Sequence, residues 1–104
     1  MAGKKRKGID ESLREQLALK GASLEHHEDL LSDYMSLWDV KNELIKDIRT
    51  RGVSYKDFSA AGNVMWKNNP SIKELVGVNR QMLSILKELK LTTDEMGGGD
   101  ADDL

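Results

Sequence analysis

The chain has 104 residues, a formal net charge of −2, one proline and no cysteine. A chain of this length forms one domain at most, with a thin core. The absence of cysteine excludes disulfides, thiolate nucleophiles and cysteine-type zinc sites. No apolar run approaches the ~18 residues of a membrane span, and no apolar segment at the start resembles a signal peptide. We therefore expect a cytoplasmic protein that has no membrane partner.

Charge is distributed in blocks along the chain. Residues 1–8 contain four cations and no acid, whereas residues 92–104 contain five acids and no base. Such blocks often serve as interaction tails, and a segment rich in glycine and aspartate cannot build a core. We predict a basic flexible arm over 1–8, a helical domain over 9–91 and a disordered acidic tail over 92–104.

Residues 9–20 predict a short helix. Asp10 is a plausible N-cap, Leu13 and Leu17 have helical spacing, and Gly21 is a stop signal. A helix of about twelve residues is marginal by itself, so it must dock on something or fray.

A much longer helix is predicted from a cap at Ser23 to a left-handed glycine at Gly52. About 28 residues at 1.5 Å each give roughly 42 Å, longer than a compact domain of this size requires. The helix should overhang its own core and leave apolar surface for another copy of the chain. The predicted oligomer interface consists of Leu31, Met35, Trp38, Ile45 and Trp66.

Residues 53–67 favour extended structure, with a turn at Gly62 and Asn63, so we predict a small β-hairpin or an ordered loop. Asn69 as cap and Pro70 at the first position then start a second amphipathic helix. Gly77 inside this helix marks a close helix crossing or is simply tolerated. The predicted fold is all-α and oligomeric, with a short N-terminal helix and two long amphipathic helices.

Between residues 30 and 91 a series of packing and turn residues follows a recognisable order: Tyr34, Trp38, Gly52, Gly62, Asn63, Asn69, Pro70, Ser71, Ile72, Leu75, Asn79, Met82, Leu83, Leu86, Leu89 and Leu91. This order resembles the small terminase subunits of tailed phages, of the P27-like kind. The resemblance implies a glycine between Leu89 and Leu91, where this chain has Lys90. It implies a ring-like homo-oligomer that recognises viral double-stranded DNA and regulates the large subunit, which carries the ATPase and nuclease.

DNA binding is expected at the basic end of the chain, because a cluster of cations neutralises phosphates without reading sequence. The alternative is a solubilising end. A helix-turn-helix over 10–51 is less consistent with the sequence, since acidic residues begin its second helix. The candidate DNA-binding residues are Lys4, Lys5, Arg6, Lys7, Arg14 and Lys20.

Few residues are arranged as a catalytic site or a metal site would require. His26 and His27 are adjacent on a helix and point in different directions, a poor geometry for a metal site or a catalytic triad. We predict no enzymatic activity, no cofactor and no metal. A helical adaptor that binds another protein but not nucleic acid is the main alternative, and a small transcription regulator is a third. The candidate contacts for a large subunit in the tail are Asp100, Asp102, Asp103 and Leu104.

Overall fold

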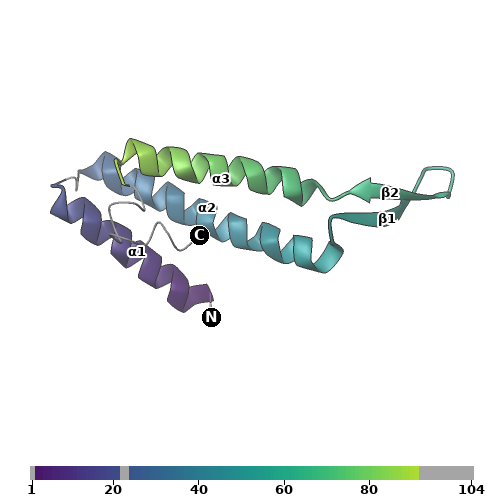
Figure 1. The fold of residues 1–104 in the computed structure, drawn as a ribbon, viewed down its shortest axis with the longest axis horizontal. Coiled ribbons are helices and arrows are strands. Elements are labelled where there is room, and N and C mark those ends of the chain that lie inside the picture. Colours follow the sequence, from purple (N-terminus) through teal and green to yellow (C-terminus); the bar gives the residue numbers. More distant parts are fainter. Residues whose placement is uncertain (1, 22–23, 92–104) are drawn as a thin grey trace, which may run out of the picture.

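The computed structural model describes residues 2–21 and 24–91, which form three helices and one β-hairpin (Figure 1). The predicted disordered tail over 92–104 lies outside the described residues. The mostly helical architecture is confirmed, and of the two alternatives for 53–67 the hairpin is correct. In chain order the elements are α1 (Ala2–Leu19), α2 (Glu25–Arg51), β1 (Ser54–Phe58), β2 (Val64–Asn68) and α3 (Pro70–Glu88).

The predicted start of the first helix is wrong, because α1 begins at Ala2 and residues 2–8 are helical rather than a flexible arm. Lysine and arginine are good helix formers, and no proline interrupts the segment, so the helix continues through its two glycines. Asp10 lies inside α1 and accepts a 3.1 Å hydrogen bond from Arg14 one turn later. It therefore does not cap the helix.

The start of α2 differs from the prediction, whereas its end at Gly52 is as predicted. Leu24 occupies the N-cap with an extended backbone and no side-chain hydrogen bond, while Ser23 lies outside the described residues. At the other end Gly52 has φ 85° and ψ −176°, a combination essentially restricted to glycine. The chain therefore passes directly from α2 into the hairpin.

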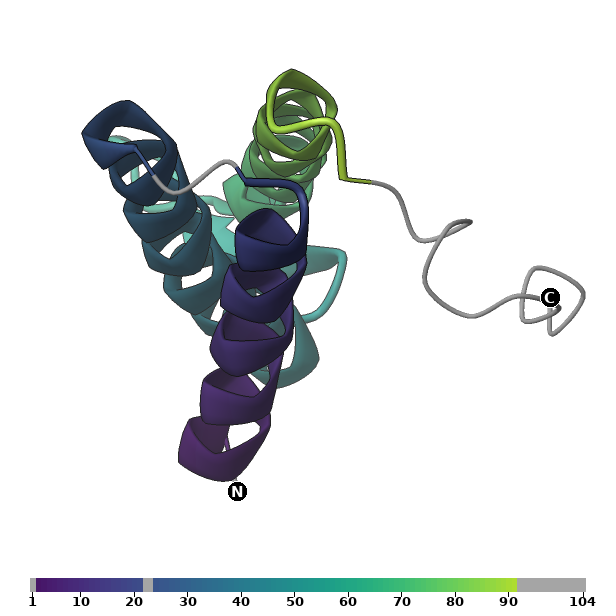
Figure 2. The same ribbon diagram turned by 90° about the vertical axis from the view of Figure 1, so that its left-hand side faces the viewer.

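The three helices lie together at one end of the molecule, and α1 does not reach the hairpin (Figure 1). The end-on view shows the ends of all three helices (Figure 2). Ion pairs of Arg14 with Glu28 and of Arg6 with Asp39 show that α1 runs antiparallel to α2. We call this part the bundle half: α1, residues 25–39 of α2, and residues 82–91. It contains every buried apolar side chain of the described residues, namely Leu13, Leu17, Leu31, Met35, Trp38, Met82, Leu89 and Leu91.

A Schellman motif ends α3. The backbone N–H of Leu91 donates to the oxygen of Leu86 at 2.8 Å, and that of Lys90 donates to Lys87 at 3.0 Å. Lys90 itself has φ 58°, the left-handed conformation that glycine adopts most readily. This backbone conformation is the physical reason for the glycine that the family resemblance implies at position 90. The turn buries Leu91, and the ammonium of Lys20 donates to the Lys90 oxygen, which ties the end of α3 to α1.

The remaining residues, 40–81, form the hairpin half: the end of α2, the β-hairpin and the start of α3. Its buried side chains are both polar, Asn69 and Ser71. The hairpin extends the antiparallel α2–α3 pair into a molecule that measures 60 × 33 × 25 Å (Figure 1). None of the helices in the described segments has the length and apolarity needed to cross a membrane.

Candidate nucleic-acid interface and assembly surfaces

The first two turns of α1 present free positive charge. Lys4, Lys5 and Lys7 are exposed and make no ion pair with any described residue. Arg6 lies on the opposite side of the helix, where its Nε is 2.7 Å from Asp39 Oδ1, and this hydrogen bond raises the pKa of the guanidinium. The structure therefore separates three of the four predicted cations from the fourth. The three lysines are the charges free to meet a phosphate backbone.

This cluster is electrostatically unfavourable for the helix that carries it. A helix N-terminus is the positive end of the macrodipole, and cations there cost about 0.3–1 kcal/mol each at exposed positions. No acid occupies the first turn of α1 to offset this. Anions are favoured at the same end, so a phosphate group would relieve the repulsion among the lysines.

The other two predicted DNA-binding residues have partners within the chain. Arg14 contacts Asp10 and Glu28 and so joins α1 to the start of α2. Lys20 donates to the backbone oxygen of Lys90. Both side chains fasten the bundle half together, and they do not extend the free cluster.

Three of the predicted interface residues are used inside the chain. Leu31, Met35 and Trp38 are in the core, with Leu31 fully buried, so in this structure they offer almost no surface to another copy. Their apolar stripe is covered by α1 and α3. Ile45 is half-buried in the hairpin half, and Trp66 is 64% exposed. Unpartnered apolar surface therefore lies further along α2 and in the hairpin, beyond the part that α1 covers.

One face of the hairpin is apolar and open. Cross-strand partners share a face of a sheet, so Phe58 opposite Val64 and Lys56 opposite Trp66 form one surface, which we call the aromatic face. Phe58 is 68% exposed. The ammonium of Lys56 lies 5.6 Å from the centre of the Trp66 ring, within the range of a cation–π interaction.

The opposite face of the hairpin carries Met65 and charged side chains that are paired within the chain. Lys67 Nζ lies 2.9 Å from Asp57 Oδ2, and this hydrogen bond lowers the pKa of Asp57. The guanidinium of Arg51 stacks over Tyr55 with 4.7 Å between its central carbon and the ring centre. Charges on this face are satisfied within the chain, in contrast to the exposed aromatic face.

A polar junction fixes the direction of the hairpin relative to the helices. Arg51 donates two 2.9 Å hydrogen bonds to Asp47, and the hydroxyl of Ser71 donates to the same carboxylate at 2.6 Å. The Asn69 side chain accepts from the Ser71 N–H at 2.9 Å and donates to the Gly52 oxygen at 2.9 Å. The hydrogen bonds that Asp47 accepts, from Arg51 first and then from Ser71, lower its pKa to about 2.

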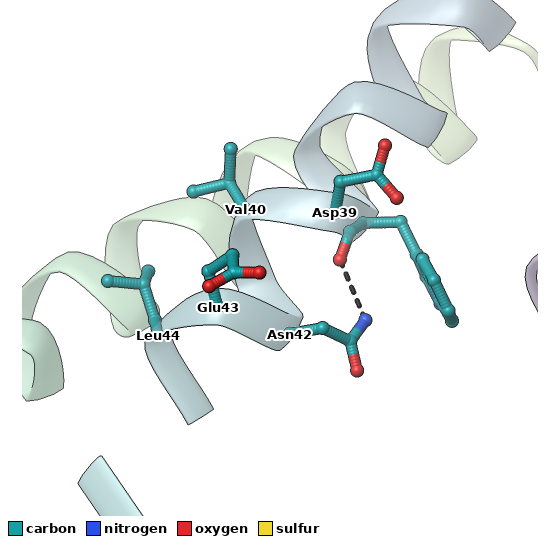
Figure 3. Close-up of a pocket in the computed structure, with 6 residues that line it drawn as sticks. Asp39, Val40, Asn42, Glu43 and Leu44 are labelled. Carbon is teal, nitrogen blue, oxygen red and sulfur yellow. Dashed lines mark hydrogen bonds between the residues drawn. The ribbon is translucent and has the colours of Figure 1, made fainter. Parts of the chain in front are cut away.

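A surface pocket of about 360 Å³ lies on α2, just beyond the point where Arg6 of α1 contacts Asp39 (Figure 3). Val40 and Leu44, one turn apart, point to the same side of the helix, and the Glu43 carboxylate lies between them in this view. We call this the α2 pocket. Its lining residues are Trp38, Asp39, Val40, Asn42, Glu43 and Leu44.

A second pocket of similar volume lies at the base of the hairpin, where β2 meets α3. Asn68 is on the same strand face as Trp66, two residues away, so this base pocket adjoins the aromatic face. Its rim carries the cation Lys73. The lining residues are Val53, Asn68, Asn69, Pro70, Ile72 and Lys73.

Sequence reasoning identified Asn69 as a helix cap but missed its bridge to Gly52, and it missed the α2 pocket altogether. A signal for the pocket existed, because Val40 is an apolar residue outside the stripe that the core uses. His26 and His27 have ring centres 4.1 Å apart. Within residues 2–21 and 24–91, no group of three potential ligands could hold a metal ion.

Comparison with known proteins gives one match. The model of the family described as "Phage terminase, small subunit" matches residues 11–96, which is most of the chain. No curated protein and no solved structure matches significantly. The matched range contains most of the bundle half and all of the hairpin half, and it begins after the free lysines of α1.

Proposed function

The chain belongs to the phage terminase small subunit family, and on this premise we propose that it is a non-catalytic DNA-recognition and regulatory subunit of a viral DNA packaging motor. Its substrate is viral double-stranded DNA, and its partner is the large terminase subunit. It acts in the host cytoplasm as a ring-like homo-oligomer of the P27-like kind. Neither a cofactor nor a metal takes part.

The observation that supports DNA recognition is the position of Lys4, Lys5 and Lys7. They are exposed, free of ion pairs with the described residues, and held on a helix that opposes their charge. Each phosphate contact contributes a slope of about −0.9 to log affinity against log salt. Three lysines therefore give a slope of about −2.7 for each engaged chain. Several chains in one oligomer strengthen the contact by avidity.

The test is a gel-shift titration of DNA over a range of salt concentrations. The variant Lys4→Ala, Lys5→Ala, Lys7→Ala should bind all sequences more weakly, with a flatter salt slope. Its matched control carries alanine at three exposed lysines elsewhere and has the same net charge. If the two triple variants bind alike, the basic end is only a solubilising segment. The control positions are Lys46, Lys73 and Lys87.

The adaptor hypothesis gives the opposite result, since neither the parent nor any variant would bind DNA at any salt concentration. A transcription regulator with a helix-turn-helix is disfavoured by the fold. α1 lies antiparallel along α2, and the start of α2 carries Glu28, which pairs with Arg14. A recognition helix would instead present its first residues to base edges.

The acidic tail is the proposed contact for the large subunit. Carboxylates at the chain end suit a basic partner surface, and Leu104 would be an apolar anchor among them. Deletion of 94–104 should weaken binding to the large subunit while the oligomer mass, measured by light scattering, stays unchanged. A loss of the oligomer would make the tail structural. The tail residues concerned are Asp100, Asp102, Asp103 and Leu104.

A further inference from the structure

The aromatic face is exposed apolar surface on a small element. A two-stranded hairpin is marginally stable by itself in water, and here Phe58 and Trp66 are about two-thirds exposed. Aromatic side chains are enriched at the centres of protein interfaces, where they carry much of the binding energy. An exposed face of this composition on a projecting hairpin is typical of a protein contact.

The α2 pocket offers a surface of complementary chemistry. Its exposed apolar part comes from Val40 and Leu44, while the mostly buried Trp38 lies at its edge. Of its two carboxylates, that of Asp39 is neutralised by Arg6, whereas Glu43 forms no ion pair with the described residues. The pocket therefore combines apolar surface with one uncompensated negative charge.

The aromatic face combines apolar surface with one positive charge. Lys56 is held over the Trp66 ring, so the cation and the aromatic group form a unit. Like charge disfavours the base pocket as its site, because Lys73 stands at that rim. We propose that the aromatic face of one copy docks into the α2 pocket of a second copy of this chain, with Lys56 meeting Glu43.

This contact rests on the proposed function, in which the chain forms a homo-oligomer. It specifies which two surfaces meet between neighbouring copies. The aromatic face and the α2 pocket are different surfaces of the same chain, so the interface is heterologous, and such interfaces form rings when the rotation closes. Phe58 and Trp66 together leave roughly 200–300 Å² to be buried. An average interface buries about 800 Å² per partner. The remaining area of each interface must come from the helix surface that surrounds the aromatic face and the α2 pocket.

A charge exchange tests the pairing directly. Lys56→Glu and Glu43→Lys should each place like charges together and weaken assembly about tenfold or more. The double variant restores opposite charges and should assemble within about threefold of the parent. The matched control is Lys73→Glu, which makes the same charge change in the hairpin half outside the contact. The readout is mass against concentration by light scattering, with helix content checked by circular dichroism.

Each outcome decides the question. Weakened single variants with a restored double variant support the contact. Single variants that assemble like the parent overturn it, and so does a double variant that remains as weak as the single ones. An equal loss in the Lys73→Glu control would show a general charge effect and would also overturn the pairing of Lys56 with Glu43.

Trp66→Ala gives a second measurement that does not depend on charge. The side chain is exposed, so its removal should leave the fold intact and weaken assembly roughly thirtyfold. An unchanged mass would overturn the docking and leave the hairpin for another protein.

DNA binding measured on the same samples separates the docking proposal from the proposal of DNA recognition. A monomeric parent that binds DNA overturns the docking and the ring-like oligomer but leaves DNA recognition standing. An oligomer that binds no DNA overturns DNA recognition and leaves the docking standing.

Discussion

The bundle half and the hairpin half are built from the same two long helices but are stabilised by different means. In the bundle half, α1 adds a third layer and buries apolar side chains such as Leu17 and Leu31. In the hairpin half there is no third layer, and the buried side chains are Asn69 and Ser71 in a polar junction. Apolar burial scales with the area removed from water. The bundle half therefore carries most of the apolar burial of the single chain, and the hairpin half leaves apolar side chains exposed.

The largest expected effect is on the free energy of unfolding, and it should differ between a buried and an exposed leucine. Leu31→Ala removes a fully buried side chain and should lower the free energy of unfolding by about 2–5 kcal/mol. Leu83→Ala, at a position that is 67% exposed, should change it by less than about 0.5 kcal/mol. Thermal unfolding at one fixed protein concentration measures both. A cost for Leu83→Ala as large as that for Leu31→Ala would mean that a partner covers the outer face of α3.

The next effect concerns the polar junction. Asn69→Ala removes the α3 cap and the bond to Gly52, and it should cost about 1–2 kcal/mol. Hydrogen exchange should speed up in β1 and β2 while the amides of α1 are unaffected. Asn68→Ala is the control, since the neighbouring Asn68 is exposed. Faster exchange throughout the chain would show that the two halves unfold as one unit.

Two substitutions should raise the free energy of unfolding, whereas the preceding ones lower it or leave it nearly unchanged. Gly77→Ala should stabilise α3 by about 1 kcal/mol, because an added methyl group would meet no atom within 4 Å. Gly77 is therefore tolerated rather than required by a close crossing. Lys90→Gly should stabilise by a similar amount, because glycine adopts φ 58° without the penalty of a side chain. Raised midpoints of thermal unfolding check both, and a lowered midpoint for Lys90→Gly would mean that its side chain contributes a contact of its own.

The smallest effect is a dependence on acid. The folded-state pKa of Asp47 is about 2, below its ordinary 3.8, chiefly because Arg51 donates to it. A lowered pKa contributes stability that is present above pH 3.8 and is lost as the pH falls toward 2. The midpoint difference between the parent and Asp47→Asn should therefore shrink over that range. Asp33→Asn, at an exposed position, is the control. A difference independent of pH would contradict the role of the charge.

Local signals in the sequence predicted much of the fold. The apolar period placed the two long helices, and Asn69 with Pro70 marked the start of α3 to the residue. Gly62, which has φ 85°, marked the turn of the hairpin. These features depend on neighbouring residues and are readable from one chain. The start of α1 was misread because Asp10 matches a cap signal that a continuing helix overrides.

The candidate site could be predicted only in part, because a residue type does not reveal its partner. Lys4 and Arg6 are alike in sequence, yet one is free and the other meets Asp39, 33 residues away. Trp38 and Trp66 are equally apolar, yet one is in the core and the other is exposed. The two long helices, the position of the hairpin turn and the charge blocks were thus determined by the sequence alone, since they arise from local sterics and spacing. Which apolar and charged groups remain exposed was decided only by the tertiary structure, because α1 covers one half of α2 and leaves the other open.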